Sequence, residues 1–437
     1  MLVSKKILTI IYIFLLGSVS AFAQQEMTLQ FLTWVPQAGY TDLTLQPDHY
    51  KKSIGVPFIS SIQLYYLNPA FKYNGLVHDN VVQPNNVIPK LKKYNQLYSG
   101  GSIDLFSMRF KTEKTYFQVS LRDVWSQRFV YTSDLANLVW NGNASFAGKS
   151  ANLNNIRVAM NYYRELAFGV TKSVNDRFII GVRGKFLMGL TNVTTQDSKN
   201  TLYTAPDGLS LSGHSQFTLL TSGLINDDQI KAGDLFGFQN LGAAADVGGR
   251  YKFSDKFSIA ANVTNLGFIN WKKDVKNYRV NGDYTYTGYI MHDSADIANA
   301  DWQNIVDTLE TIFKPKEDKK SYKSWLTPTV YVSGNYLLRP DLNLYSSVAL
   351  DIYHGVRPTF TLGATQSFGQ RIQATLSYSL TPSSYFNLGG GFVVRGGPVQ
   401  FYIVTDNIIG VFDPYAVKYA NVRVGINLLM GKAETAD

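Results

Sequence analysis

The sequence predicts an all-β fold, a transmembrane antiparallel outer-membrane β-barrel of about fourteen strands, from three observations. Segments about ten residues long alternate apolar with polar residues, and the connections between these segments are alternately short and long. Tyr (28) and Phe (26) are abundant, while only 17% of the residues are charged. Outer-membrane barrels combine such strands with short turns at one end, long loops at the other and aromatic girdles. A soluble β-sandwich has strands of about five or six residues and no such sorting of loops.

The N-terminus has the order of a secretory signal peptide. Lys5-Lys6 precede an apolar run from Ile7 to Leu16, and Ala21-Phe22-Ala23 follow it. The run is shorter than the ~18 apolar residues of a membrane-spanning helix, and no later stretch reaches that length. We therefore expect residues 1–23 to be removed on export and the mature chain to lie in the outer membrane.

Composition excludes several classes of function. Cysteine is absent, which removes thiolate nucleophiles and Cys-based metal sites. The formal net charge is +9, but the basic residues are scattered, so a nucleic-acid partner is not expected. Outer-membrane lipid and lipopolysaccharide, which carry anionic groups, are the expected partners of this cationic surface. No cofactor is expected.

The mature chain begins with a lead-in of residues 24–55. Its one apolar piece, Leu29 to Val35, is followed by Pro36-Gln37 and a polar run. This composition indicates a segment in or under the barrel lumen. The barrel is then expected over residues 56–430, with a periplasmic tail at 431–437.

Fourteen segments carry the alternation of a wall strand. They are Val56–Tyr66, Ser102–Phe110, Thr115–Val124, Ile156–Val170, Arg177–Thr191, Leu241–Phe253, Phe257–Trp271, Thr329–Leu338, Leu342–Tyr353, Thr359–Thr365, Ile372–Ser379, Phe386–Arg395, Val399–Thr405 and Val422–Leu428. Two weaker patterns, Thr201–Thr204 and Leu209–Ser222, would raise the count to sixteen. Because they are shorter and more polar, fourteen is the prediction.

The long external loops are expected at about 68–100, 126–155, 192–240, 272–326 and 406–420. Within them the sequence predicts a short helix at Ser133 to Trp140 and a second helix at Asp301 to Lys314. Asn281-Gly282 between two tyrosines predicts a surface hairpin.

The functional candidates are charged residues on the face opposite the apolar one. They are Asp104, Arg122, Arg157, Glu165, Arg183, Lys185, Asp246, Arg250, Asp351, Arg395 and Arg423. Two interpretations stay open: the charges neutralise one another and hold the plug, or they line a solute path. Arg164 lies on the apolar parity, which indicates a β-bulge or a position near lipid headgroups.

Catalytic and metal sites are not expected. The five histidines lie in different segments, none in an i, i+4 pair: His49, His78, His214, His292 and His354. No Gly-x-Ser-x-Gly motif occurs; a rim site built from separate segments would involve His214-Ser215 or His354. The aromatic residues around the loop at 272–326 indicate an interfacial belt or a capture surface: Trp271, Trp302, Trp325, Tyr278, Tyr284 and Tyr286.

From about Thr28 to Met430 the chain resembles a family of Bacteroidota outer-membrane barrels of unknown function, distantly similar to long-chain fatty acid transporters (FadL-like). The residues that carry the resemblance include Ile54-Gly55-Val56-Pro57, Asn265 to Trp271, Asp406-Asn407-Ile408 and Arg423 to Asn427. The family's Asn-Pro-Ala after Pro36-Gln37 is replaced here by the region of Asp42-Leu43-Thr44.

The resemblance implies a transport-type barrel, for hydrophobic or small solutes. It also leaves open a non-transporting adaptor that binds another envelope protein, as some barrels of these bacteria do in type IX secretion.

Overall fold

The computed structural model describes residues 26–47, 50–78, 81–226, 238–286, 315–352, 355–382 and 384–431. The expected signal peptide, the expected helix at 301–314 and the tail from 432 lie outside these ranges. So do His49, His292, His354 and Trp302, and the side chain of His78.

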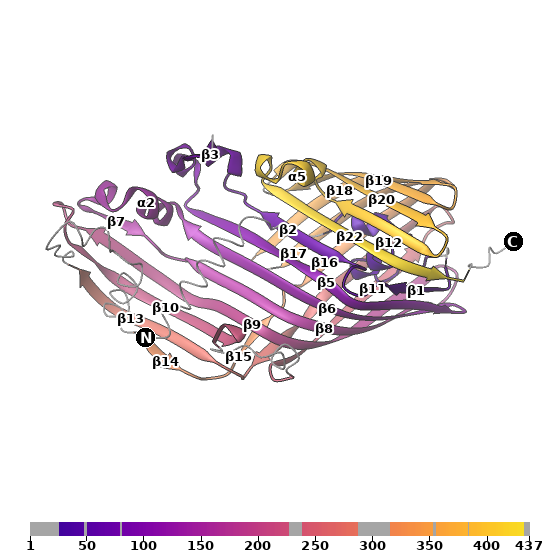
Figure 1. Ribbon diagram of the computed structural model, residues 1–437, viewed down its shortest axis with the longest axis horizontal. Helices are drawn as coiled ribbons and strands as arrows, with labels where there is room; N and C mark the ends of the chain where they lie inside the picture. Colours follow the sequence, from indigo (N-terminus) through magenta and orange to yellow (C-terminus); the bar gives the residue numbers. More distant parts are fainter. Residues whose placement is uncertain are drawn as a thin grey trace.

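The wall of the fold is a closed antiparallel sheet (Figure 1). Its strands are β1 (Lys52–Gly55), β2 (Ile62–Leu67), β5 (Tyr94–Thr112), β6 (Thr115–Thr132), β8 (Arg157–Ser173), β9 (Phe178–Thr204), β11 (Leu241–Lys252), β12 (Phe257–Trp271), β16 (Thr329–Arg339), β17 (Leu342–Ile352), β18 (Val356–Phe368), β19 (Ile372–Thr381), β20 (Ser384–Gly396), β21 (Val399–Thr405) and β22 (Tyr419–Met430). β1 and β2 both pair with β5, every later strand pairs with the next, and β22 returns to both β1 and β2. With β1 and β2 counted as two halves of one strand, the described residues form fourteen wall strands, which confirms the predicted fold class and number.

The first wall strand is interrupted. Val56 to Tyr66 was expected to be continuous, but residues 56–61 belong to no strand. They keep only irregular bonds to β22: the Val56 N–H donates to the Ile426 carbonyl, and the Ile426 N–H donates to the Ile59 carbonyl. Phe58 adopts a positive φ of 65°, which is strained for a bulky residue. Pro57 cannot donate to a ladder, and Phe58 beside it is 62% exposed. The prediction of a strand over this half was wrong.

The outer face of the wall is apolar. On β11 and β12 the residues Val247, Tyr251, Phe257 and Ile259 are exposed, while Asp246, Ser258 and Ala260 of the other parity are buried. Aromatic pairs lie at the end with short turns, as at Phe253 and Phe257, whose ring centroids are 5.5 Å apart. An apolar band bordered by aromatic rings is the outer surface of an outer-membrane barrel.

Beyond the other end, which we call the long-loop end, the wall is extended by additional strands (Figure 1). The far half of β9 pairs with β10 (Leu211–Gly223), which pairs with β13 (Lys276–Tyr286) and through it with β14 (Lys316–Asp318). The two weak strand patterns at 201–222 therefore belong to this extension, not to the barrel. The predicted hairpin at Asn281-Gly282 is wrong, because both residues lie inside β13 and pair with β10.

The remaining elements of the long-loop end are short. They are α2 (Ser133–Asn141), β7 (Lys149–Asn152), β15 (Tyr322–Trp325), α5 (Ile408–Phe412), the hairpin of β3 (Val77–His78) and β4 (Val81–Val82), and the 3-10 turns η4 (Tyr73–Gly75), η5 (Pro84–Asn86), η6 (Ile88–Lys90), η7 (Ala144–Phe146), η8 (Leu224–Asn226) and η10 (Pro414–Ala416). The helix expected at Ser133 to Trp140 is confirmed as α2. It begins where the Thr132 hydroxyl accepts from the backbone N–H of Leu135, at 3.0 Å.

Candidate functional site

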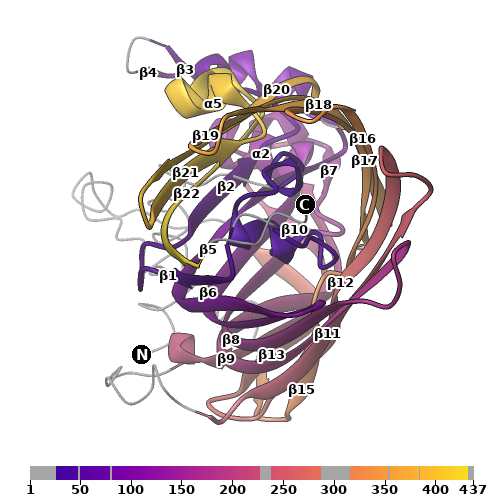
Figure 2. The same cartoon turned by 90° about the vertical axis from the view of Figure 1, so that its right-hand side faces the viewer.

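The N-terminal segment lies inside the ring of strands, as Figure 2 shows from the short-turn end. It contains two 3-10 turns, η2 (Leu29–Phe31) and η3 (Pro36–Tyr40), and almost every residue from 26 to 47 is buried. We call residues 26–47 the plug.

The start of the plug is held by a buried carboxylate just after β21. Asp406 accepts from the backbone N–H groups of Met27 and Thr28, at 3.2 and 2.7 Å, and from the hydroxyl of Tyr419 at 2.6 Å. Burial raises the pKa of Asp406 above its ordinary value. The Thr28 hydroxyl also lies 2.7 Å from that of Ser377 on β19.

The wall approaches the plug so closely that side chains are excluded at some positions. A Cβ at Gly181 would lie 2.6 Å from the carbonyl oxygen of Leu43, and one at Gly391 would lie 2.7 Å from Leu32. Leu32 belongs to an apolar cluster that joins the plug to β20 and β21 through Val393, Tyr402 and Val404. The plug is therefore packed against the wall as a protein core is packed.

A belt of alternating charges runs along the lumen face of five neighbouring strands, from β5 to β11. Arg122 lies 3.2 Å from Asp104 and 3.7 Å from Glu165, and Lys185 lies 3.3 Å from Glu165. Asp246 closes the belt, 3.0 Å from Lys185 and 2.7 Å from Arg183. All six side chains are at most 10% exposed. On β22, Arg423 extends the belt by pairing with Glu26 of the plug, 2.8 Å from Nη2 to Oε2.

Tyr40 of the plug lies at the centre of this belt. Its hydroxyl donates to Asp104 at 2.7 Å, and the guanidinium of Arg122 lies 4.0 Å from its ring centroid. Arg183 and Arg423 lie 5.4 and 5.7 Å from the same ring, within reach of cation–π attraction. Burial raises the pKa of the Tyr40 phenol well above its ordinary value, so the hydroxyl stays protonated and remains a donor.

A second attachment lies nearer the short turns. Asp42 pairs with Arg250 and accepts from the amide of Asn262 at 3.2 Å. Arg109 donates to the carbonyl oxygen of Leu45. The plug is thus bonded to strands on most of the circumference of the barrel. Every buried charge named above has a partner, as buried charges require.

The other charges predicted for the lumen lie apart from the belt. Asp351 is buried on β17 near Arg128 and Arg357. Arg157 lies at the long-loop end of β8, beside Asn155, and Arg395 is partly exposed near the turn between β20 and β21.

Arg164 pairs with Asp123 at 2.7 Å, next to a register shift between Tyr162 and Tyr163. The shift shows that a β-bulge does occur beside this residue.

Sequence reasoning did not identify the partners that the plug supplies, Glu26, Tyr40 and Asp42. These residues have no periodicity, and only their contacts in the folded chain reveal a role. Asp406 was noted only as part of a family motif, without a role.

The wall is irregular beside the belt, at Asn265. Between the pairs Ala245↔Leu266 and Val247↔Val263, β12 has one more residue than β11, and Asn265 takes a positive φ of 62°. The Asn265 N–H donates to Asp246 at 2.7 Å, and its side chain accepts from Lys185 at 2.8 Å. This is a β-bulge locked by the charged belt.

On the far side of the bulge β12 changes partner. It pairs with β16 only as far as Thr264↔Thr329, and its end at Phe268 to Trp271 pairs with the short β15 instead. Between these two pairings, one backbone hydrogen bond connects the segments, from the N–H of Leu326 to the carbonyl of Gly267. The ladder of backbone hydrogen bonds is therefore interrupted beside Asn265.

A cavity of about 1160 Å³ opens at this thin part of the wall. Its lining includes residues of the outer face, Ala243, Ala245 and Leu266, and residues of the lumen face, Ala244 and Leu326. More of the lining is apolar than polar. A cavity of this size and character is typical of a site for an apolar small molecule.

Next to the cavity the lumen itself is apolar. Trp271, expected to belong to an interfacial belt, is fully buried, and its indole N–H donates to Ser324 at 2.8 Å. It forms one cluster with Tyr163, Leu187, Ala244, Ile269 and Leu326. By contrast Trp325 is 72% exposed on the outer face.

His214 is exposed and lies 2.9 Å from Asp283, across β10 and β13. Among the described residues, no group of three or more acidic or histidine side chains is placed to hold a metal ion. No helix of the described part of the chain is both long and apolar enough to cross a membrane.

Comparison with known proteins gives a family and a set of folds. A model described as a family of unknown function (DUF5723) matches residues 45–406. No curated protein matches the chain.

Three of the similar solved structures are a FadL homologue, a hydrocarbon channel and a toluene transporter. A Pseudomonas aeruginosa FadL homologue is 11% identical with a TM-score of 0.44, over 94% of this chain and 98% of that chain. A deltaS2 mutant of the monoaromatic hydrocarbon channel TodX is 8% identical with a TM-score of 0.43, over 94% and 96%. The Ralstonia pickettii toluene transporter TbuX is 10% identical with a TM-score of 0.35, over 95% and 96%. Identities this low do not assign a function.

Proposed function

Since the chain belongs to the DUF5723 family of unknown function, its activity has to be argued from its own geometry, and we propose that it is an outer-membrane channel for small apolar solutes. The observation that carries the proposal is the apolar cavity at the bulge of β12.

The plug argues against a channel for water-soluble solutes. A porin keeps a continuous polar passage along the axis. Here the axis is filled by residues 26–47, whose charges are all matched by wall residues, as at Glu26 with Arg423 and Asp42 with Arg250. A polar solute would have to displace these pairs, whereas an apolar solute in the cavity meets none of them.

The cavity offers an apolar solute a route that avoids the plug. It is lined from both faces of the wall, so a solute in it contacts the lumen cluster around Trp271 on one side and the lipid-facing side chains Ala245 and Leu266 on the other. The lining also contains polar residues, among them Asp197 and Lys323, but apolar solute surface buried against its apolar part contributes roughly 25 cal/mol per Å².

Filling the cavity is expected to stop uptake. Replacing Ala243 and Ala245 together with tryptophan puts two large rings on the outer lip, while Ala261→Trp puts one on the same lipid-facing surface away from the cavity. The measurement is the rate at which N-phenyl-1-naphthylamine, an apolar dye that lipopolysaccharide excludes, becomes fluorescent in cells that make equal amounts of folded barrel. We expect wild type and Ala261→Trp to raise the rate, and the double variant to lose at least about nine tenths of that increase, a factor of ten.

If the double variant takes up dye as fast as wild type, the cavity is not the route.

A partner-binding role is the second candidate, and the extension of β9, β10 and β13 beyond the barrel favours it. Exposed apolar side chains also occur at this end, as at Trp140 of α2 and Phe412 of α5. A barrel that raises no dye uptake but copurifies with another envelope protein at fixed stoichiometry would establish this role instead.

A further inference from the structure

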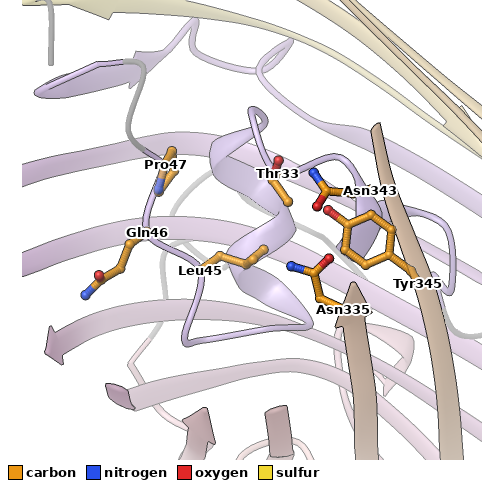
Figure 3. A pocket seen from close by; sticks show the side chains of 7 residues that line it. All are labelled: Thr33, Leu45, Gln46, Pro47, Asn335, Asn343 and Tyr345. Atoms are coloured by element: carbon orange, nitrogen blue, oxygen red, sulfur yellow. The ribbon is translucent and has the colours of Figure 1, made fainter. Parts of the chain in front are cut away.

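Two features of the barrel lie away from the proposed route. One is a cavity of about 210 Å³ between the plug and the strands β16 and β17 (Figure 3). Its lining, in the part of the chain that the structure describes, holds no charged side chain, and a small space with a neutral polar lining suits water. The other is a surface outside the wall, at the long-loop end, where apolar side chains and lysines lie together.

The helix α5 lies against the outer face of the wall. Gly391 of β20 faces the plug, so its neighbour Gly390 faces outward, and a Cβ there would lie 2.9 Å from the side chain of Ile408. On β22, Ala420 lies against Gly410 of the same helix, where a Cβ would be only 2.5 Å away. Figure 2 shows α5 outside the ring of strands. The helix therefore lies on the side of the wall that faces lipid.

The side of α5 and η10 that is turned away from the wall is apolar. Four of their side chains are exposed, and that of Phe412 is 85% exposed: Ile409, Val411, Phe412 and Tyr415. The turn η4 continues this surface. The ring of Tyr73 packs edge-on against Tyr415, with centroids 6.2 Å apart, and lies 5.3 Å from the ring of Tyr66 on β2. Exposed apolar side chains gathered in one place mark a binding site for lipid or for another protein.

Three lysines lie beside this surface. Lys72 directly precedes Tyr73. Lys418 directly precedes β22, and its Nζ donates to the carbonyl of Pro69 at 2.9 Å. Partial burial lowers the pKa of Lys418, and the nearby charges of Lys92 and Lys72 lower it further. Within the described ranges none of the three ammonium groups forms an ion pair with a carboxylate. Like charges gathered in this way repel one another, and an anion bound among them removes the repulsion.

The height of these lysines matches the border between lipid chains and headgroups. β22 has 12 residues and begins one residue after Lys418. A strand of that length, rising ~3.4 Å per residue and tilted by ~40°, spans roughly 30 Å, whereas the apolar band of such barrels is about 25 Å tall. Lys418 therefore lies just beyond the band, and α5, which packs on Ala420, lies at its edge.

We propose that this surface binds one molecule of lipopolysaccharide, with a phosphate of its lipid A on Lys72, Lys92 and Lys418 and its acyl chains on α5. Lipid A combines the two groups that match the surface, a phosphate of about −1.5 to −2 charge and apolar chains directly below it. Lipopolysaccharide also belongs to the outer leaflet, on the side of the membrane to which long loops extend. The site is independent of the apolar cavity and of the proposed channel function.

The test is binding of lipid A, and of lipid A from which the phosphates have been removed, to the purified full chain in detergent. Native mass spectrometry counts the bound molecules and measures the affinity. One variant replaces Lys72, Lys92 and Lys418 with glutamine. The matched control replaces three exposed lysines of the short-turn end with glutamine: Lys114, Lys252 and Lys256.

We expect one lipid A on wild type and on the control variant, with an affinity at least about tenfold lower for the variant at the long-loop end. Removing the phosphates from lipid A should have an equally large effect on wild type. Phe412→Ser should weaken binding of both lipids, since it removes apolar contact rather than charge.

Equal affinities of the two triple variants for lipid A would overturn the proposal, as would wild type that binds lipid A equally well without its phosphates. Lipid A displaced completely by inorganic phosphate would show an anion site without a lipid, which also contradicts it. A protein that copurifies with wild type in place of lipid, and is lost from the variant at the long-loop end, would assign the surface to a protein partner instead.

Discussion

Asp246→Asn is expected to lower the free energy of unfolding by roughly 3–5 kcal/mol, the cost of removing one partner from a buried ion pair. Asp246 is fully buried and is the shared partner of Arg183 and Lys185. The substitution therefore leaves the buried Arg183 facing a neutral amide, and leaves Lys185 with Glu165 as its remaining carboxylate. The measurement is equilibrium unfolding by urea in lipid vesicles, followed by tryptophan fluorescence.

The matched control is Asp318→Asn on β14. Asp318 pairs with Arg279 at 3.1 Å, but the Arg279 side chain is 50% exposed, so its loss should change the unfolding free energy by less than about 1 kcal/mol. Equal effects at the two positions would contradict a structural role of the belt. Asp246 also holds the N–H of Asn265, so the same variant should disturb the bulge and alter dye uptake.

Loosening the plug is expected to turn a closed barrel into one that conducts ions. Tyr40→Ala combined with Asp42→Ala removes the ring between three guanidinium groups and the partner of Arg250. Wild-type barrel in a planar bilayer should show no stepwise current, and the double variant should show it. The arginines that lose their plug partners are then stabilised by water, which enters the lumen as the plug is displaced.

Because the chain contains no cysteine, two cysteines can be added to the double variant to test whether re-attaching the plug stops the current. Thr28→Cys and Ser377→Cys place two thiols where the native hydroxyl oxygens are 2.7 Å apart, which suits a disulfide. Oxidation should tie the plug to β19 and lower the current at least about tenfold, and reduction should restore it. Wild type that conducts as well as the double variant would show that the plug does not close the lumen.

The fold could be predicted because its signal is local. Alternation with period two repeats in almost every wall strand. The weak pair at 201–222 was correctly left out of the barrel, but its second segment is not part of a loop: it forms β10, a strand of 13 residues in the extension. The errors have physical causes. Asn281-Gly282 is a strong hairpin signal on its own, but pairing with β10 on one side and β14 on the other keeps the strand extended. At Val56 to Ser61 the apolar pattern continues through a segment that leaves the ladder.

The candidate site could be predicted less completely from the sequence. Parity separates Glu165, Lys185 and Asp246 from the apolar face, but their partners depend on which strands become neighbours. The plug residues Tyr40 and Asp42 lie in an irregular segment without any period. The apolar cavity needs the bulge at Asn265 and brings together residues about sixty positions apart, such as Leu266 and Trp325, so no local pattern could reveal it.

The most direct measurement is a crystal structure of the barrel soaked with a brominated apolar ligand, in which anomalous scattering locates the bromine. The account predicts a bromine peak inside the cavity between Ala244 and Leu326, with the plug still seated against Asp104 and Arg423. Bromine found only on the outer lipid-facing surface, or only along an axis from which the plug has moved, would contradict it.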